Sequence, residues 1–198
     1  QVVIVPIWKN DEQKAAVTEV AERAARHLRD DGVRVRIDDR ESESPGSKFW
    51  EWERKGVPLR IEVGPRDVEK GNLALAKRLV PEGESRKEFL PEAEALASIG
   101  DRLQAIQDGM LAAARARTEA NTHHVSDYET FRTQLEAEGG FFYAGWCGSA
   151  ECEDKVKDET KATIRVLPNP EFRSATAPET CLACGEAAAH EAVWARAY

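Results

Sequence analysis

The stretch QVVIVPIWKNDEQKAAVTEVAERAARHLRDDGVRVRI, residues 1–37, decides the fold class. Residues 2–8 are almost entirely apolar, which is typical of a buried strand, and residues 33–37 alternate like a half-buried one. Between them, Asn10 begins a helix whose apolar residues recur at helical spacing up to Leu28. This order is a βαβ unit, so we expect its two strands to be parallel and the fold to be α/β.

The rest of the chain shows weaker signals for further elements. A helix at 47–55 and a strand at 57–63 follow a Ser-Pro-Gly break, and residues 73–79 fit either a strand or a helix. Residues 81–92 are rich in Pro, Glu and Lys and indicate an exposed loop. The remaining predicted elements are helices at about 93–122 and 128–137 and strands at 141–146 and 163–167. We divide the chain into domains of residues 1–125 and 126–198, with Gly139-Gly140 as a clear break ahead of the cysteines.

The charge of the chain limits the classes of partner that it is expected to bind. A net charge of −8 disfavours non-specific binding to duplex DNA, which depends on neutralising phosphates. Local recognition of a few bases remains compatible with the sequence, because residues 48–78 carry eight basic and five acidic side chains. No apolar run approaches the roughly 18 residues of a membrane span, and no signal peptide opens the chain. Gln1 stands directly before a strand, so we expect a fragment of a longer protein.

The cysteines Cys147, Cys152, Cys181 and Cys184 form two close pairs that 28 residues separate. Two such knuckles supply the four thiolates of a tetrahedral Zn²⁺ site. Four buried thiols or two disulfides are the alternatives, but nothing in the sequence points to an oxidising compartment. We favour a structural zinc, since four protein ligands leave no open position for catalysis. His190 would be a ligand only if one cysteine did not bind.

Other candidate sites have plainer explanations. His123 and His124, predicted on a helix, would point about 100° apart and would not converge on a metal. Asp38-Asp39 follows a strand and suits metal binding or acid–base chemistry, but we favour a solvated turn with a helix-capping role. The sequence contains no GxSxG, P-loop or GxGxxG motif. We therefore predict no catalytic site in this chain.

Residues 45–67, PGSKFWEWERKGVPLRIEVGPRD, interleave aromatic, acidic and basic side chains on a helix and the strand after it. This mixture suits unpaired bases, which stack on aromatic rings and are read on their Watson–Crick edges. A guanine offers N1–H and N2–H₂ donors to carboxylates, and O6 and N7 acceptors to Arg or Lys. An amphipathic helix with a charged face is the alternative on physical grounds alone.

Together these motifs resemble the C-terminal half of prolyl-tRNA synthetase, in the archaeal- and eukaryote-like type that has an extra zinc-binding domain. The resemblance runs the whole length and rests on Asp38-Asp39-Arg40, residues 45–60, Gly64-Pro65-Arg66-Asp67, the four cysteines and the terminal Ala-Tyr. It implies that residues 1–125 form a mixed sheet flanked by helices, the anticodon-binding fold of class II synthetases. It implies a small α+β zinc-binding domain in residues 126–198.

The resemblance further implies that the first domain binds the anticodon of the tRNA for proline. All proline anticodons share two adjacent guanines, which acidic and basic side chains read in the family. The matching positions here are Glu53, Arg60, Arg66, Asp67 and Lys87. A Lys also occurs in the family where Arg66 stands, and Lys87 falls in the predicted 81–92 loop.

The parent enzyme that the resemblance implies is a cytoplasmic homodimer. Its catalytic domain would precede Gln1, activate proline with ATP and Mg²⁺, and transfer it to the tRNA 3′ end, so this chain alone is expected to bind tRNA without aminoacylating it. Its partners would be the tRNA for proline and that catalytic domain, with no DNA and no membrane. Tyr198 matches a C-terminal Tyr whose carboxylate reaches toward the catalytic site in relatives.

Two other functions are compatible with the residues. A non-enzymatic, zinc-containing module for RNA or protein interaction would bind cognate and non-cognate tRNA alike. A redox protein that uses Cys181 and Cys184 would hold no stoichiometric zinc. Binding comparisons and elemental analysis separate these alternatives.

Overall fold

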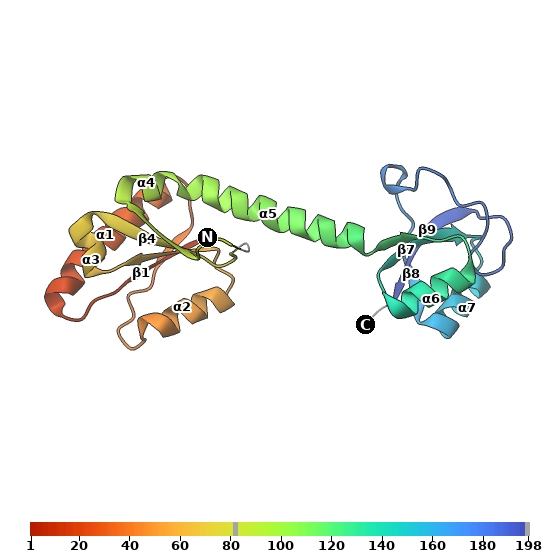
Figure 1. The fold of residues 1–198 in the computed structure, drawn as a ribbon, viewed down its shortest axis with the longest axis horizontal. Helices are drawn as coiled ribbons and strands as arrows, with labels where there is room; N and C mark the ends of the chain where they lie inside the picture. The colour runs from red at the N-terminus through yellow and green to blue at the C-terminus, as the bar shows by residue number, and fades with distance from the viewer. Residues whose placement is uncertain (81–82, 197–198) are drawn as a thin grey trace. The chain divides into compact units, whose positions relative to one another are not determined.

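The computed structural model describes residues 1–80 and 83–196 and divides into two compact units. Unit 1 ends at Leu111 and unit 2 begins at Ala112, so the division falls inside helix α5 (Ile99–Ala120). Figure 1 shows the elements of each unit along the chain. Helix α5 thus belongs in part to each unit. The domain boundary that we predict after residue 125 stays a prediction.

Unit 1 is built on a five-stranded sheet with the order β2-β1-β3-β4-β5. The strands are β1 (Val2–Pro6), β2 (Val35–Ile37), β3 (Leu59–Val63), β4 (Asn72–Lys77) and β5 (Lys87–Pro91). β1 pairs in parallel with β2 and β3, whereas β4 and β5 join the sheet antiparallel. The predicted parallel βαβ unit is confirmed, and the antiparallel strands make the sheet mixed.

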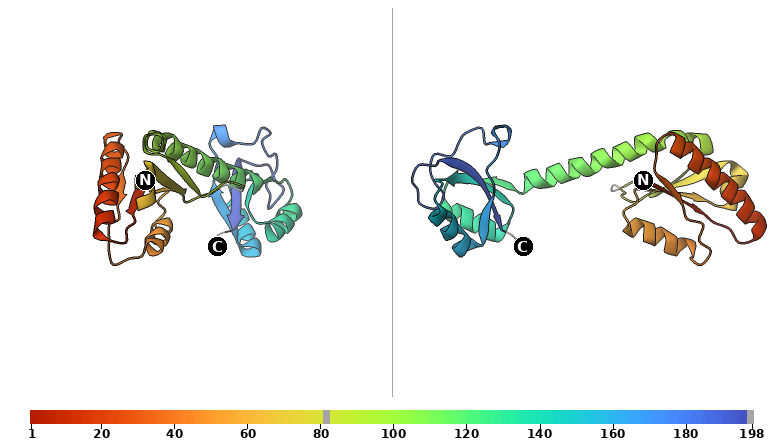
Figure 2. Two further views of the ribbon diagram at one scale, coloured as in Figure 1. Left: turned by 60° about the vertical axis from the view of Figure 1, so that its left-hand side comes forward. Right: turned by 180° about the vertical axis from the view of Figure 1, so that it is seen from behind.

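Helices cover both faces of this sheet (Figures 1 and 2). The helices of unit 1 are α1 (Asp11–Asp30), α2 (Pro45–Arg54), α3 (Pro65–Lys70), α4 (Glu92–Ala97) and the first half of α5. On one face, Ile4 and Ile61 belong to a core that α1, α4 and the start of α5 complete. On the other face, Val3 and Val5 of β1 pack with Trp52 of α2. α2 therefore covers that face around β1.

Strand β5 corrects the prediction of a loop at 81–92. Residues 87–91 pair antiparallel with β4 in a continuous ladder, although their own composition is typical of a loop. The pairing overrides the local propensity, because strand preference depends strongly on neighbouring strands. The ambiguous segment at 73–79 is a strand as far as Lys77 for the same reason, since β4 lies between β3 and β5.

The long helix predicted at 93–122 is two helices, α4 and α5, that meet at Ser98. The Ser98 hydroxyl donates to the carbonyl of Ala95 at 2.9 Å and accepts from Arg102 Nε at 2.8 Å. Such side-chain bonds compete with the helical ladder, which explains the break at this residue. In the part of the chain that the structure describes, no helix has the length and apolar character needed to cross a membrane.

Unit 2 holds a second sheet with the order β6-β7-β9-β8. Its elements are β6 (Thr122–His124), α6 (Tyr128–Ala137), β7 (Phe141–Trp146), α7 (Ala150–Thr160), β8 (Ala162–Val166), a short 3₁₀ helix (Pro170–Phe172) and β9 (His190–Arg196). Its core includes Phe131, Phe142, Val156 and Trp194. The predicted helix α6 and strands β7 and β8 are confirmed, whereas α7 and β9 carried no signal that the sequence analysis used.

The prediction that His123 and His124 lie on a helix is wrong, because both lie in β6. Parallel pairing with β7 places each ring on an aromatic partner, His123 on Phe142 at 4.7 Å and His124 on Tyr143 at 5.0 Å between centroids. Successive strand residues point to opposite faces of a sheet, so the two rings do not converge on one metal.

Asp38 is buried, with 3% of its surface exposed, which corrects the prediction of a solvated turn. Its carboxylate accepts bonds from the Arg40 guanidinium at 2.8 Å and from Trp52 Nε1 at 2.7 Å. Lys48 Nζ donates to the Asp38 carbonyl at 3.2 Å. The Arg40 donors, helped by Trp52, outweigh burial and hold the pKa of Asp38 well below its usual range. Asp38 thus fastens helix α2 to the end of β2.

We expect Asp38→Asn to lower the free energy of unfolding by about 1–3 kcal/mol at neutral pH, because an amide satisfies Arg40 and Trp52 less well. The folded-state pKa lies below the unfolded one, so the carboxylate stabilises the fold above about pH 4, and this contribution is lost as the pH falls. Urea denaturation at several pH values measures both effects. The exposed Asp39→Asn is the matched control, and equal stability of the two variants would contradict the assignment.

Candidate nucleic-acid interface and metal centre

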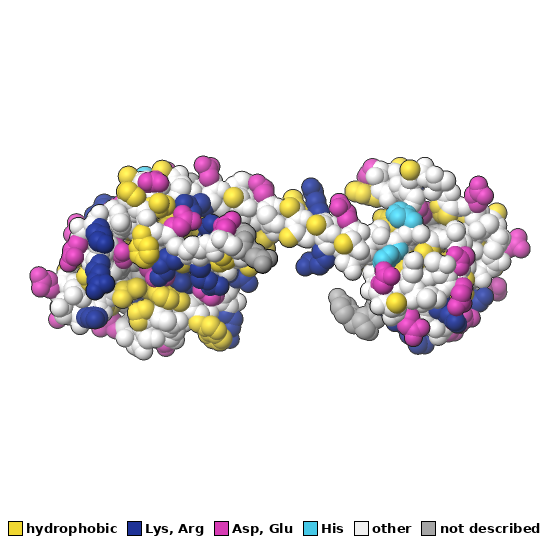
Figure 3. Space-filling view, in the orientation of Figure 1, with side chains coloured by type: hydrophobic (Ala, Val, Ile, Leu, Met, Phe, Trp, Pro, Cys, Tyr) yellow, Lys and Arg dark blue, Asp and Glu magenta, His cyan; other side chains and the backbone are white. Residues whose placement is uncertain are grey.

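Charged side chains gather on the sheet face of unit 1 that carries α2. The alternation of β3 puts Arg60 and Glu62 on this face, while Ile61 points to the opposite core. The register aligns Arg60 with Ala76 of β4 and Ala76 with Lys87 of β5, so Lys87 lies in the same row as Arg60. Figure 3 shows Lys and Arg side chains beside hydrophobic ones on unit 1.

Arg60 is held from three directions. Its Nη1 donates to Glu53 Oε1 at 3.0 Å, and its Nε donates to Glu62 Oε1 at 3.1 Å. Its Cζ lies 4.0 Å from the centroid of the Phe49 ring, a cation–π contact. Only 8% of Arg60 is exposed, so its guanidinium has one well-defined orientation.

Glu53, in the last turn of α2, is the second anchor of this face. Its Oε1 also accepts from Arg86 Nη1 at 2.7 Å, and its backbone carbonyl accepts from Arg78 Nε at 2.9 Å. Burial works to raise the pKa of Glu53, but the bonds from Arg60 and Arg86 outweigh it and lower this pKa. Glu53 is therefore an ionised acceptor at neutral pH.

Lys87 completes the group by donating to Glu62 Oε2 across β4. Glu53, Arg60, Glu62 and Lys87, with the Phe49 ring, are called the β3 cluster below. Three of the five predicted binding residues meet in it. Glu62 is not among the predicted binding residues, although its position two residues after Arg60 on a strand places it on the same face.

Arg66 and Asp67 lie apart from the β3 cluster, on helix α3. The Asp67 carboxylate accepts from the backbone N–H of Gly64 at 2.9 Å and so caps this helix. Arg66 is exposed. Among the described residues, no hydrogen bond or ion pair links either side chain to the cluster.

The four cysteines of unit 2 converge on one point, with all four sulfur atoms within 4.8 Å of one another. The Cys147 sulfur lies 3.6 Å from that of Cys152 and 4.0 Å from that of Cys184. A tetrahedral Zn²⁺ with bonds of about 2.3 Å requires sulfur–sulfur distances of about 3.8 Å. The residues therefore fit a four-coordinate metal. Cys147 follows β7, Cys152 lies in the first turn of α7, and the other two lie in a turn before β9.

A close backbone approach brings the two cysteine pairs together. A Cβ atom on Gly145 would lie 2.1 Å from the carbonyl oxygen of Thr180, so a glycine is required where β7 meets this segment. Leu182 N–H donates to the Gly145 carbonyl at 2.8 Å, and Lys155 Nζ of α7 donates to the Ala183 carbonyl at 3.1 Å. These bonds hold the Cys181–Cys184 turn against β7 and α7.

The thiols of this cluster differ in acidity. Burial, followed by the contact with Cys147, raises the pKa of Cys152 to about 12. Burial also works to raise the pKa of Cys181, but backbone N–H donors, first that of Cys184, outweigh it and lower this pKa to about 7. Because metal binding requires thiolates, the affinity of such a site increases with pH.

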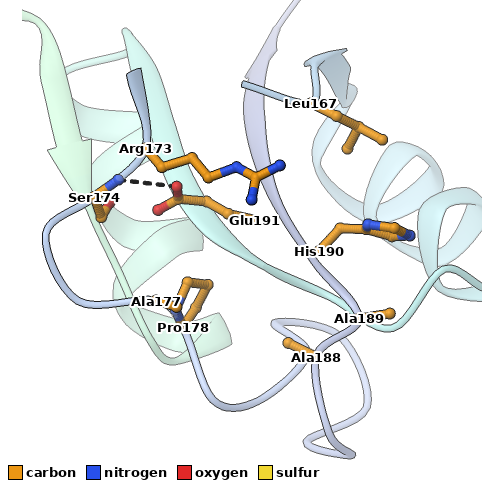
Figure 4. A pocket seen from close by; sticks show the side chains of 9 residues that line it. All are labelled: Leu167, Arg173, Ser174, Ala177, Pro178, Ala188, Ala189, His190 and Glu191. Carbon is orange, nitrogen blue, oxygen red and sulfur yellow. Dashed lines mark hydrogen bonds between the residues drawn. The ribbon is translucent and has the colours of Figure 1, made fainter. Parts of the chain in front are cut away.

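Among the residues that the structure describes, His190 does not join the four cysteines in one potential metal-binding group. Its ring lies 5.8 Å from that of Trp146 and lines a pocket of about 200 Å³ with Arg173 and Glu191 (Figure 4). Within this pocket Glu191 accepts from the Ser174 N–H at 3.0 Å. The four cysteines thus need no substitute ligand.

Two protein families match separate parts of this chain. The family described as the anticodon binding domain matches residues 1–101, which hold the sheet of unit 1 and the β3 cluster. The family described as prolyl-tRNA synthetase, C-terminal, matches residues 128–198, which hold the cysteines. Residues 102–127, which lie between the two matches, hold most of α5 and strand β6.

Individual relatives agree with the family matches. The chain is 42% identical to the proline–tRNA ligase of Chlorobium phaeovibrioides and 41% identical to that of Chloroflexus aggregans, over 100% of this chain and 40% of each relative. A crystal structure of prolyl-tRNA synthetase from Cryptosporidium parvum, in complex with L-proline and AMP, is similar with a TM-score of 0.83 and 30% identity. That likeness covers 100% of this chain and 41% of the other. The chain thus spans about 40% of the length of the relatives it matches.

Proposed function

Because the chain belongs to the anticodon-binding domain family, joined to the C-terminal domain of prolyl-tRNA synthetases, we propose that it recognises the anticodon of the tRNA for proline. The observation that carries the proposal is the β3 cluster, which sets ionised carboxylates and oriented cations beside an aromatic ring on one sheet face. The cluster lies within the residues that match the anticodon-binding family.

The chemistry of the cluster suits guanine. A carboxylate such as Glu53 accepts from guanine N1–H and N2–H₂, and Arg or Lys donates to O6 and N7. In the described residues, Nη2 of Arg60 donates to no protein atom, while Nε and Nη1 are both used. In this proposal, Nη2 is the Arg60 donor that meets a base. The Phe49 ring adds a surface on which unpaired bases stack.

Arg66 and Asp67 would contribute from α3. Arg66 is exposed and carries a positive charge at the start of this helix. Asp67 already accepts from Gly64 N–H, so base recognition would use its second oxygen or an exchange of partners. We assign both residues to the edge of the proposed anticodon site, with Glu53, Arg60 and Lys87 at its centre.

The four cysteines are proposed to hold a structural Zn²⁺. The chemistry of the donor set supports zinc, because four thiolates in a tetrahedron are a common structural zinc site. Four protein ligands leave no position for a substrate, so the metal would stabilise the fold of unit 2 rather than take part in a reaction. This assignment also explains why a turn without a large core of its own lies against β7 and α7.

The proposal extends to a larger enzyme, a proline–tRNA ligase. Activation of proline with ATP and Mg²⁺ would belong to a catalytic domain outside these 198 residues, and that domain and the tRNA would be the partners of this chain. We place the enzyme in the cytoplasm as a homodimer, on the basis of the resemblance. Tyr198, proposed to reach the catalytic site, lies outside the described residues.

We expect Arg60→Ala to weaken binding of a proline tRNA transcript by about 1–3 kcal/mol, because one oriented base contact is lost. Filter binding or gel shift with the 198-residue chain measures this change. Arg23→Ala is the matched control, since Arg23 pairs with Glu92 on the α1 side of the sheet. An equal loss of affinity for a tRNA with an unrelated anticodon would favour a general RNA-binding module instead.

Elemental analysis of the purified chain should give about one zinc ion per molecule. Removal of the metal with a chelator should abolish hydrogen-exchange protection in β7, β9 and α7, because the two cysteine pairs then lose their link. Protection in β1 and β3 of unit 1 should persist and serves as the internal control. A chain without zinc, or one whose unit 2 is unaffected by the chelator, would contradict the metal assignment.

A further inference from the structure

Glu62 is a buried carboxylate at the centre of the β3 cluster, and neither the family match nor the sequence motifs give it a role. Only 4% of the residue is exposed, although it lies on a strand face that carries other charged groups. Its two oxygens bind different cations, Oε1 the Nε of Arg60 and Oε2 the Nζ of Lys87. A buried charge of this kind persists only when it is paired and hydrogen-bonded.

Small side chains on β4 allow the contact between Glu62 and Lys87. The two residues belong to β3 and β5, which lie about 10 Å apart because β4 separates them. The β4 residues that face them are Ala74, opposite Glu62, and Ala76, opposite Lys87. Their methyl groups leave room for the Lys87 side chain to cross β4, and both alanines are nearly fully buried.

The contacts of Arg60 show what Glu62 does for the cluster. Glu62 accepts a hydrogen bond from the Nε of Arg60, Glu53 accepts one from Nη1, and the guanidinium lies over the Phe49 ring. Two carboxylates thus fix the plane of the guanidinium and direct its remaining edge. Without Glu62, Arg60 could rotate about its last bonds, and Lys87 would have no fixed direction.

We infer that Glu62 is a positioning residue that orients both Arg60 and Lys87 for base recognition. This inference rests on the proposed function, because it assigns Glu62 to the same anticodon site. Glu62 itself makes no contact with the base. It sets the geometry of two cations that do, and so it determines how well the site distinguishes guanine from other bases.

The test compares Kd values of the 198-residue chain for a proline tRNA transcript and for one whose two anticodon guanines are replaced. We expect Glu62→Gln to weaken cognate binding about tenfold, which is the size of one lost oriented contact. Non-cognate binding should stay equal or tighten, because Lys87 no longer has its anionic partner and its charge is available to phosphates. The ratio of the two Kd values should therefore fall.

Two further variants separate positioning from simple charge compensation. Glu62→Asp keeps the charge but shortens the side chain, so it should also reduce the Kd ratio while the chain remains folded by circular dichroism. Glu88→Gln removes a carboxylate of β5 that pairs with Arg102 on the opposite face, and it should leave the ratio unchanged. A Glu62→Asp variant that discriminates like the wild type would overturn the inference. A wild-type chain that shows no discrimination would instead overturn the proposed function.

Discussion

Unit 1 depends on one physical constraint, the pairing of two cations, Arg60 and Lys87, with two carboxylates, Glu53 and Glu62, on the sheet face that α2 covers. Charges removed from water are costly unless each has a partner, and here Arg60 and Glu62 are almost fully buried. Arg60 binds Glu53 and Glu62 at once, and Lys87 binds Glu62 across β4. The arrangement therefore requires that helix α2 and strands β3 to β5 keep fixed positions. The buried Asp38 also holds α2 in place, because it bonds to Trp52, the neighbour of Glu53, and to Lys48 one turn earlier.

A second constraint organises unit 2, where a close backbone approach at Gly145 and the burial of Leu182 bring the two cysteine pairs together. Gly145 permits a backbone approach that any side chain would block, and this approach places the Cys181–Cys184 turn beside Cys147. Backbone N–H groups directed at Cys181 already favour its thiolate form. Unit 2 thus carries four sulfur atoms that already lie close enough to hold a metal, while unit 1 carries a set of charged side chains that already pair with one another. Each unit has its own core and its own polar site.

The sequence could predict those features that depend on local spacing. The βαβ opening follows from periodicity and a capping signal, and the convergence of the four cysteines follows from their two close pairs. Strand β5 was missed because its composition is typical of a loop and only its pairing with β4 makes it a strand. Glu62 was missed for a related reason, since its role depends on Lys87, which lies 25 positions further along the chain. Asp38 appeared to be a solvated turn because its partner Trp52 belongs to another element.

The most direct test of the account replaces single atoms of the RNA rather than residues of the protein. Inosine lacks only the N2 amino group of guanine, so a proline tRNA with inosine at one of its two anticodon guanine positions removes a donor that a carboxylate accepts. Titration of this 198-residue chain with the two transcripts measures whether its carboxylates read that group. The account predicts weaker binding of the inosine transcript by at least about 1 kcal/mol at one position. Equal affinity for guanine and inosine at both positions would contradict it.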